Sequence, residues 1–376
     1  MDRSRFDVTV ILPSRGTFSK VLKGIDIPFS IIQLPMGLIR LKRGKTLKSF
    51  LSLCAFFFVL TFFFLKLCIF LKRNRFNLIV TNTVKSHLYG SIAARLCSIP
   101  LIWRFHDVLV SPDFGASLVR FVALFAGSFP EKIYAVSKIT KTHLVRCGVR
   151  SDKVEVIFNA VDNGISKVRR SRDIREEFKL RPGVRLVGCV GRIIPQKGQK
   201  ILLKAIPGVI ERFPEVFFLT IGDPSFKEEA YRDELLEIVR KHGLEEKVGF
   251  CGFRDDIGSV MRHFDALVFP SLAPEAFGLS VLEAMRLGKP VIASDTGGVR
   301  EMIEDRVNGL LVEPNHPEQI TEAILFLFMN PDLSARIGKK AKETAEQKFS
   351  LKNYVSSMEE AMEKWQKGQG RGQISE

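Results

Sequence analysis

The sequence lacks the cysteine patterns that build disulfide frameworks and zinc sites. Its six cysteines lie far apart, with no C-x-x-C pair and no cysteine–histidine spacing that would bind zinc. This usage fits a reducing compartment such as the cytosol. The N-terminus, MDRSRFDVTVILPSRG, also lacks the charged-then-apolar layout of a signal peptide. Both absences predict a cytoplasmic protein.

Two features of nucleotide-hydrolysing and nucleic-acid-binding proteins are also missing. No G-x-x-x-x-G-K-[ST] motif occurs, which excludes a P-loop nucleotide hydrolase. The chain has only 4 tyrosines, and its 31 phenylalanines gather in apolar runs. A nucleic-acid-binding surface would interleave cations with exposed aromatic residues. The sequence therefore disfavours nucleic acid as a partner, despite a net charge of +16.

The positive charge belongs to one half of the chain. Residues 1–165 carry 24 Lys and Arg against 9 Asp and Glu, whereas the remainder carries 33 against 32. An anionic membrane surface or an anionic substrate is the remaining explanation for such a basic half. At 376 residues the chain is too long for one ordinary core, so two domains are expected.

One long apolar segment lies inside the basic half. Residues 50–71 read FLSLCAFFFVLTFFFLKLCIFL, with cationic residues before and after them. Their number is enough to span a bilayer. Lys66 and the position inside an α/β domain argue against a span, and the flanking cations favour a helix that docks in the membrane plane. An ordinary domain helix is the third interpretation.

Short strand-like runs alternate with helical patterns along the whole chain. In the first half these runs cover residues 8–12, 78–80, 101–105 and 133–135, and in the second half 184–190, 216–221, 248–251, 266–269 and 290–293. Such alternation indicates parallel sheets covered by helices, and residues 155–162 with the charged run 166–179 read as a linker. We predict an α/β protein of two doubly wound domains facing a cleft, residues 1–165 and 166–350, followed by a C-terminal helix and polar tail at 351–376.

The first chemical motif follows a predicted strand of the second domain. The apolar run 186–190 ends at Gly191, and Arg192 and Lys197 stand before a predicted helix. Arg192 offers a planar fork of N–H donors, Lys197 offers a mobile point charge, and Gly198 lets the backbone turn tightly. Two loop cations in isolation are usually only solvated. Their position after a buried strand favours the binding of a diphosphate, whose growing charge they would stabilise without a metal.

The second motif, PEAFGLSVLEAM at residues 274–285, supplies two acids eight residues apart. Glu275 stands in a loop, and Glu283 falls one turn into a helix expected to begin near Leu279 or Ser280. The helix N-terminus after Gly278 would aim free N–H groups at an anion. The carboxylates would accept hydrogen bonds from sugar hydroxyls. Taken alone, such a pair is more often a first-turn acid and a solvated helix glutamate.

Together these motifs resemble the C-terminal domain of the retaining glycosyltransferases of family four, the glycosyl transferases group 1, which have the GT-B fold. Supporting pieces follow in the family's order: AVSKITKTHLVRCGV, KVEVIFNAVD, FLTIGD, VGFCGFRDDI, ASDTGGVREMI and NGLLVEP. The resemblance covers nearly the whole chain and is most specific over residues 130–315. It implies a nucleotide-diphosphate sugar as co-substrate, with no cofactor and no metal. The chain has no D-x-D triplet, which agrees with metal-independent transfer, and the pair Asp255–Asp256 reads better as a helix start.

The resemblance also implies roles for individual residues. Arg192 and Lys197, next to Gly191, would bind the donor diphosphate, Glu275 the donor sugar and Glu283 the ribose. The backbone of Phe277, Gly278, Leu279 and Ser280 would meet the sugar and phosphate, and Gly252, Phe253 and Arg254 would lie near the base. His106, which follows a predicted strand in WRFHDV, matches the histidine that contacts the transferred sugar. His106, Arg192, Lys197 and Glu275 form the candidate catalytic set.

The beginning of the chain departs from the family pattern. The family opens with a strand, a glycine-rich loop and a helix, whereas residues 6–35 resemble the segment that follows that helix. About 30 residues, one βα unit, would then be missing. Two hypotheses follow. The first is a retaining hexosyltransferase, peripheral on the cytoplasmic face of the membrane, that moves a UDP- or GDP-linked sugar to a lipid-linked or polysaccharide acceptor in cell-surface polysaccharide synthesis. The alternative is a truncated, non-catalytic relative that binds donor nucleotide or acts as a membrane-associated partner.

Overall fold

A computed structural model describes residues 2–33, 47–109, 115–161, 173–224 and 228–366 of the chain. The chain divides into two compact units. Unit 1 comprises Met1–Arg104, Phe125–Ile133 and Met358–Glu376, and unit 2 comprises Phe105–Leu124 and Tyr134–Ser357. The predicted polar tail, residues 367–376, and residues 166–172 of the predicted linker lie outside the described residues.

The N-terminal half of the chain is an α/β structure with short strands. Strand β1 pairs in parallel with β2, and a second sheet has the order β3-β4-β5-β6. Strands β3 and β4 are also parallel, with Ile79 opposite Leu101. The elements are β1 (Val10–Leu12), α1 (Thr17–Gly24), β2 (Phe29–Ile31), α2 (Leu47–Arg73), β3 (Ile79–Thr81), α3 (Val84–Cys97), β4 (Leu101–Phe105), α4 (Ala116–Ser128), β5 (Lys132–Ala135), α5 (Lys138–Arg146), the 3₁₀ turn η2 (Ser151–Lys153) and β6 (Val154–Val156).

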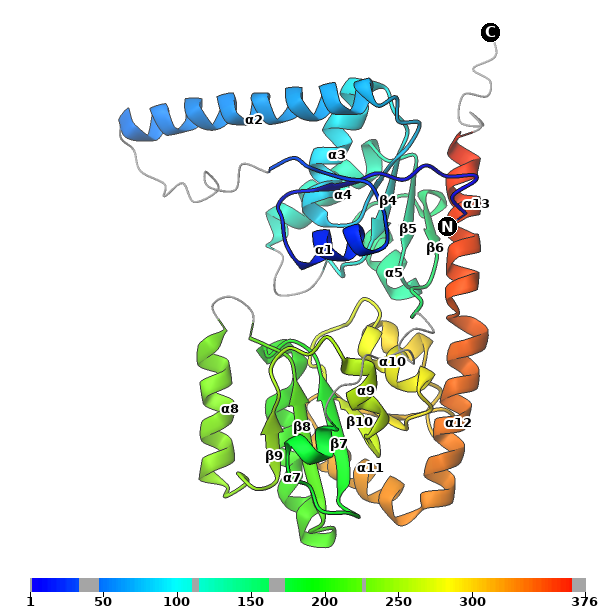
Figure 1. Ribbon diagram of the computed structural model, residues 1–376. Helices are drawn as coiled ribbons and strands as arrows, with labels where there is room; N and C mark the ends of the chain where they lie inside the picture. Colours follow the sequence, from blue (N-terminus) through cyan, green and yellow to red (C-terminus); the bar gives the residue numbers. More distant parts are fainter. Residues whose placement is uncertain (1, 34–46, 110–114, 162–172, 225–227, 367–376) are drawn as a thin grey trace. The chain divides into compact units, whose positions relative to one another are not determined.

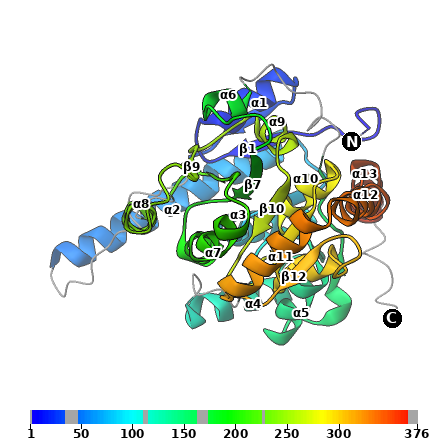
Figure 2. The same ribbon diagram turned by 90° about the horizontal axis from the view of Figure 1, so that it is seen from below.

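Helix α2 is the longest helix of unit 1, and only its C-terminal part lies against the rest of the unit. Phe63, Leu67 and Leu71 are buried in one cluster with Ala93 of α3. The remainder of the helix projects from the unit (Figure 1 and Figure 2). Across the stretches listed above, no helix is both long enough and apolar enough to cross a membrane.

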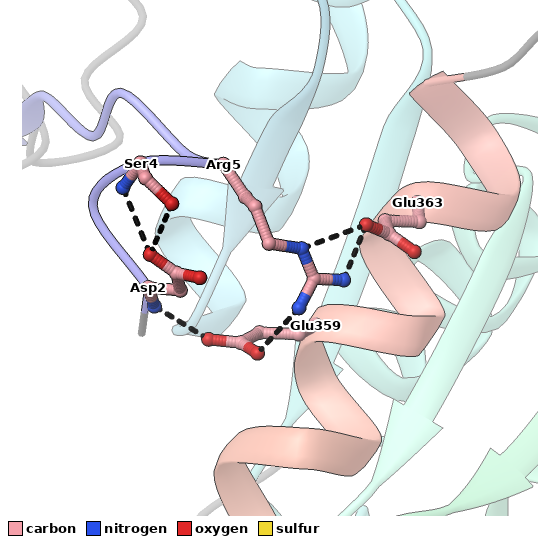
Figure 3. A network of polar contacts seen from close by, with 5 residues as sticks. All are labelled: Asp2, Ser4, Arg5, Glu359 and Glu363. Atoms are coloured by element: carbon pink, nitrogen blue, oxygen red, sulfur yellow. Dashed lines mark hydrogen bonds and ion pairs between the residues drawn. The ribbon is translucent and has the colours of Figure 1, made fainter.

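A polar network ties the N-terminus of the chain to its last helix, α13 (Leu351–Gln366). The backbone N–H of Asp2 donates to the Glu359 carboxylate over 2.7 Å, and the guanidinium of Arg5 binds the carboxylates of Glu359 and Glu363 (Figure 3). Ser4 completes the network through hydrogen bonds to the Asp2 carboxylate. Because Glu359 is almost fully buried, its two partners compensate for the loss of water around its charge. The network therefore joins the two ends of the chain within unit 1.

The C-terminal half is built on a six-stranded parallel sheet in the order β12-β11-β10-β7-β8-β9. Read from β9, this is the 3-2-1-4-5-6 order of doubly wound nucleotide-binding folds. The elements are α6 (Ile174–Glu177), β7 (Arg185–Val190), η4 (Pro195–Lys197), α7 (Gln199–Arg212), β8 (Val216–Ile221), α8 (Glu229–Lys241), β9 (Val248–Phe250), α9 (Ile257–Arg262), β10 (Ala266–Phe269), α10 (Leu279–Arg286), β11 (Val291–Ser294), η5 (Gly297–Glu301), β12 (Leu310–Val312), α11 (Pro317–Met329) and α12 (Pro331–Lys348).

Two hydrophobic layers cover the two faces of this sheet. Side chains alternate along each strand, so that Val187 of β7 enters one layer and Leu186 the other. The first layer is completed by α7, α8 and α11, and the second by α9, α10 and α12 (Figure 1 and Figure 2). A sheet buried on both faces explains why its strands read as continuous apolar runs in the sequence.

The predicted α/β class with two parallel, Rossmann-like parts is confirmed. Each of the nine predicted strand runs overlaps an observed strand, with bounds shifted by at most two residues. The sequence interpretation missed β2, β6 and β12, which have three residues each. The predicted linker is partly wrong: β6 ends inside its first segment, and α6 lies in its charged run, capped by the Asp173 carboxylate.

Candidate active site

The two motifs follow the two strands that flank the switch point of the six-stranded sheet. Strand β7 lies beside β10, with Val187 opposite Ala266, and the order of connections reverses between these strands. Ligands of such sheets bind at the carboxyl ends of the strands on either side of that reversal. Arg192 and Lys197 follow the end of β7, and Glu275 follows the end of β10. Topology therefore brings together two segments that lie about 80 residues apart in the sequence.

The first motif turns sharply from β7 into α7. After η4 the chain passes through Gly198, whose φ is 70°, in the left-handed region that favours glycine. A Cβ atom at this position would lie 1.9 Å from the carbonyl oxygen of Pro270. No residue with a side chain fits there without displacing the backbone that follows β10. The predicted tight turn at Gly198 is confirmed. At this turn the backbone of the first motif packs directly against the segment that leads from β10 to the second motif.

Lys197 and Glu275 form an ion pair at the centre of the site. The Lys197 Nζ atom lies 2.7 Å from the Glu275 Oε1 atom, and the two side chains are 18 % and 20 % exposed. The ammonium also lies 5.2 Å from the ring centroid of Phe269, the last residue of β10. Lys197 and Glu275, for which separate roles are predicted, are therefore paired with each other in the structure.

Ser271 holds the acid of this pair in place, and the sequence interpretation missed it. Its hydroxyl lies 2.9 Å from the Glu275 Oε1 atom and 3.1 Å from the carbonyl oxygens of Gln196 and Ala273. The residue is fully buried. One hydroxyl therefore joins the carboxylate to the loops of both motifs. The available signal was a small polar residue two positions after a buried strand, where binding residues of parallel sheets stand.

The segment after β11 supports the Glu275 loop from its other side. The backbone N–H of Gly298 donates to the Glu275 carbonyl over 2.7 Å. Gly297 has a φ of 63°, and a Cβ atom there would lie 2.4 Å from the backbone nitrogen and oxygen of Glu275. Only glycine permits this close approach. The repeated glycine in DTGG carried the signal, yet its packing partner was not visible in the sequence.

Helix α10 begins at Leu279, as predicted, with Gly278 before it in the left-handed region at φ 92°. Phe277 is buried, whereas Leu279 is exposed and Ser280 is partly exposed. The first N–H groups of this helix have no partner within the helix and suit an anion. Glu283 lies one turn further on, and burial raises the pKa of its carboxyl to about 7.

The loop after β9 contains the three residues predicted near the base. Gly252 has a φ of 67°, and the N–H of Phe253 donates to the Asp223 carboxylate over 3.1 Å. The Phe253 ring is 73 % exposed and offers a flat apolar surface. Arg254 instead turns to protein acids, with two contacts of 2.7 Å to Asp256 and one of 2.7 Å to Glu177. The guanidinium of Arg254 thus holds the loop.

The structure confirms the helix-start interpretation of Asp255 and Asp256, since α9 begins directly after them. Asp256 occupies the N-cap position of α9, yet its carboxylate makes no capping hydrogen bond. That carboxylate accepts hydrogen bonds from Nε and Nη2 of Arg254, which is the stronger, charge-assisted interaction. The position of the acid was therefore predicted, whereas its partner comes from the structure alone.

Three more predicted residues, Arg192, His106 and Gly191, have well-defined places. Arg192 is exposed, and its carbonyl accepts a hydrogen bond of 2.8 Å from the amide Nε2 of Gln199, a buried residue at the start of α7. His106 directly follows β4 and is partly buried, as expected of a residue at the carboxyl end of a strand. Burial also raises the pKa of the neighbouring Asp107 carboxyl. Gly191 follows β7, and a Cβ atom at this position would lie 3.6 Å from the Cδ atom of Lys197.

The arrangement combines three kinds of recognition at one sheet edge. Cations and a helix N-terminus suit a diphosphate, partly buried carboxylates suit sugar hydroxyls, and an exposed aromatic ring beside a rigid turn suits a base. Within the described ranges, no group of three or more acid, histidine and cysteine side chains is arranged to hold a metal ion. The fold and the site together define a transferase of the GT-B class that uses a nucleotide sugar.

Comparisons with known proteins assign the family. The family model for glycosyl transferases group 1 matches residues 170–344, and that for glycosyltransferase family 4 matches residues 1–164. The chain is 32 % identical over 278 residues to an uncharacterized glycosyltransferase, MJ1178, of Methanocaldococcus jannaschii, covering 73 % of this chain and 71 % of that protein. The chain belongs to the GT-B glycosyltransferases, the enzymes that act on nucleotide sugars.

Two further relatives carry information on ligands. The crystal structure of Anabaena Alr3699/HepE in complex with UDP-glucose has a TM-score of 0.81 and 28 % identity, covering 94 % of this chain and 91 % of that one. The lipopolysaccharide core biosynthesis mannosyltransferase LpcC of Rhizobium leguminosarum is 32 % identical over 177 residues, or 47 % of this chain and 50 % of LpcC.

Proposed function

We propose that the chain is a retaining hexosyltransferase that moves a sugar from a UDP- or GDP-linked donor to a lipid-linked or polysaccharide acceptor. The observation that carries the proposal is the Lys197–Glu275 ion pair at the switch point of the six-stranded sheet. The UDP-glucose complex of HepE supports a nucleotide-sugar donor, and the name of LpcC supports an acceptor from cell-surface polysaccharide synthesis. We propose further that the enzyme works in the cytoplasm, at the inner face of the membrane, without a metal ion.

Donor binding begins with an exchange of partners in the ion pair. The Lys197 ammonium and the Arg192 guanidinium bind the diphosphate, and the released Glu275 carboxylate accepts hydrogen bonds from the donor sugar. Glu283 binds the ribose, the peptide groups from Phe277 to Ser280 meet the sugar and phosphate, and the base lies over the turn at Gly252 and Phe253. Because the cation and the acid neutralise each other beforehand, the site stays intact while it is empty.

The transfer step then needs no dedicated protein base. The bond between the anomeric carbon and the diphosphate oxygen breaks, and its electron pair leaves with the phosphate. Lys197, Arg192 and the N-terminus of α10 stabilise the growing negative charge. The acceptor oxygen forms its bond to the anomeric carbon on the same face, its proton passes to the departing phosphate, and His106 holds the sugar during this step.

The test is the release of nucleotide diphosphate by the purified chain with a membrane extract as acceptor. We expect release from one UDP- or GDP-linked hexose, with the anomeric configuration of the donor kept in the product by NMR. Lys197→Ala should abolish release. Lys200→Ala is the matched control, since Lys200 lies three residues further on, is 40 % exposed and pairs with Glu234 on the surface. Donor binding without release would favour the non-catalytic relative, and neither binding nor release with any common donor would overturn the proposal.

A further inference from the structure

Helix α2 is apolar on two opposite sides, although only one side is packed. Phe63, Leu67 and Leu71 stand four residues apart and form the inner row, which is buried against α3. A helix with one packed side ordinarily carries polar residues on the other. The outer side of α2 does not follow this rule, so the packing within unit 1 does not account for its composition.

The outer row consists of Phe58, Phe62, Leu65 and Ile69. At about 3.6 residues per turn, their spacing of four, three and four residues aligns them along one stripe, roughly opposite the inner row. Their side chains are 76 %, 62 %, 56 % and 56 % exposed. Four large apolar side chains in one exposed stripe mark a surface that binds something apolar.

The segment of the chain that contains this stripe carries charge of one sign. No Asp or Glu occurs between Asp26 and Asp107, and this interval contains 12 Lys and Arg. Three of these cations, Lys66, Lys72 and Arg73, are exposed on α2 itself. An apolar stripe bordered only by cations complements the interface of an anionic bilayer, where acyl chains lie beneath negative headgroups.

We propose that the outer row of α2 inserts into the interface of an anionic membrane, with the helix axis in the plane of the bilayer. The inner row packs against unit 1 and keeps the helix attached to it. The outer row would contact the lipid. Lys66, Lys72 and Arg73 bind the headgroups on either side of the inserted stripe. This inference deepens the proposed function, because it identifies the surface that brings the enzyme to a lipid-linked acceptor.

The test uses the full chain and vesicles of 30 % phosphatidylglycerol in phosphatidylcholine, with sedimentation of the bound fraction. We expect binding to these vesicles that weakens in high salt, and little binding to pure phosphatidylcholine. The variant Phe62→Ser/Leu65→Ser/Ile69→Ser should bind at least about 100-fold more weakly. Reversing the charge of Lys66 and Lys72 should weaken binding about fivefold or more for each cation.

The matched control is Met329→Ser, which removes an apolar side chain that is 54 % exposed at the end of α11 in unit 2. This variant should bind vesicles as the unchanged chain does. Circular dichroism and the thermal midpoint show whether the triple variant is folded, since its three positions lie outside the core. Equal vesicle binding by the triple variant would overturn the inference.

A second copy of the chain is the competing occupant of the stripe. Sedimentation equilibrium without lipid would reveal a dimer, and a dimer that the triple variant abolishes, with unchanged vesicle binding, would contradict the membrane assignment. Donor binding by calorimetry is measured on the same proteins. Because α2 takes no part in the donor site, the triple variant should bind nucleotide sugar normally, so a failure of the membrane inference is distinguishable from a failure of the proposed function.

Discussion

The ammonium of Lys197 lies 2.7 Å from a carboxylate oxygen of Glu275, across the switch point of the sheet. Both side chains are largely withdrawn from water, so each is the other's main compensation for lost hydration. A donor that binds between them must supply a negative group for the cation and hydroxyl groups for the acid. We therefore expect the pair to favour a ligand with both, which is what a sugar diphosphate provides.

Single and double variants of this pair distinguish its contribution to stability from its contribution to turnover. Lys197→Ala leaves the carboxylate without its counter-charge, and we expect a loss of about 1–3 kcal/mol in the free energy of unfolding and at least about 100-fold in turnover. The double variant Lys197→Met/Glu275→Gln should regain most of the stability, by urea denaturation, and none of the activity. Recovered turnover in the double variant would contradict the roles proposed for these residues.

Ser271→Ala tests whether the buried hydroxyl positions Glu275. The variant loses one charge-assisted hydrogen bond, so we expect the KM for the nucleotide sugar to rise by about three- to tenfold. Affinity for the nucleoside diphosphate alone should stay unchanged, because that ligand lacks the transferred hexose that Glu275 is proposed to bind. A similar loss of affinity for both ligands, measured by calorimetry, would assign Ser271 a general structural role instead.

The raised pKa of Glu283 predicts that stability falls with pH. The folded protein keeps this carboxyl protonated up to a pKa of about 7, while in the unfolded chain it ionises near the ordinary glutamate pKa of 4.5. The folded state therefore binds the extra proton between these values, and the contribution is lost as the pH rises through 7. Glu283→Gln should reduce the change in the free energy of unfolding between pH 5.5 and 8 by on the order of 1–2 kcal/mol, measured by urea denaturation.

The same titration should appear in donor affinity. In the proposed function Glu283 binds the ribose, and only its ionised carboxylate would accept two hydrogen bonds from it. The affinity of the unchanged chain for nucleoside diphosphate should therefore rise as the pH increases through about 7. The Gln variant should lose this rise. A rise of equal size in both proteins would place the titrating group elsewhere.

Two glycine substitutions distinguish a backbone preference from a steric contact. Gly183 has a φ of 86° with open space around it, so Gly183→Ala should lower stability by only about 1 kcal/mol. Gly198→Ala adds a collision with the carbonyl of Pro270, and we expect a clearly larger loss, about 3 kcal/mol or more. Thermal midpoints of the two variants give the comparison. Equal losses would mean that the loops at Gly198 and Pro270 are not held together as described.

The fold was predictable because a sheet buried on both faces leaves continuous apolar runs in the sequence. The strands of residues 101–105, 216–221 and 266–269 have the predicted bounds for this reason. Strands of three residues are at the limit of this signal, since β3 and β9 were predicted and β12 was not. The partners of individual charges were also unpredictable, as with Arg254, because they depend on which segments the fold brings within hydrogen-bond distance.

The sequence by itself determined the alternation of strands and helices, the two motifs of the donor site and the basic, apolar character of α2, since these depend only on residue type and spacing. The tertiary structure alone decided that Lys197 and Glu275 form a pair, that Ser271 and Gly297 support the acid, and that one row of α2 is buried and the other exposed. The physical reason is the order of the strands. Parallel connections bring distant loops to one sheet edge, and only there do their charges and close contacts interact.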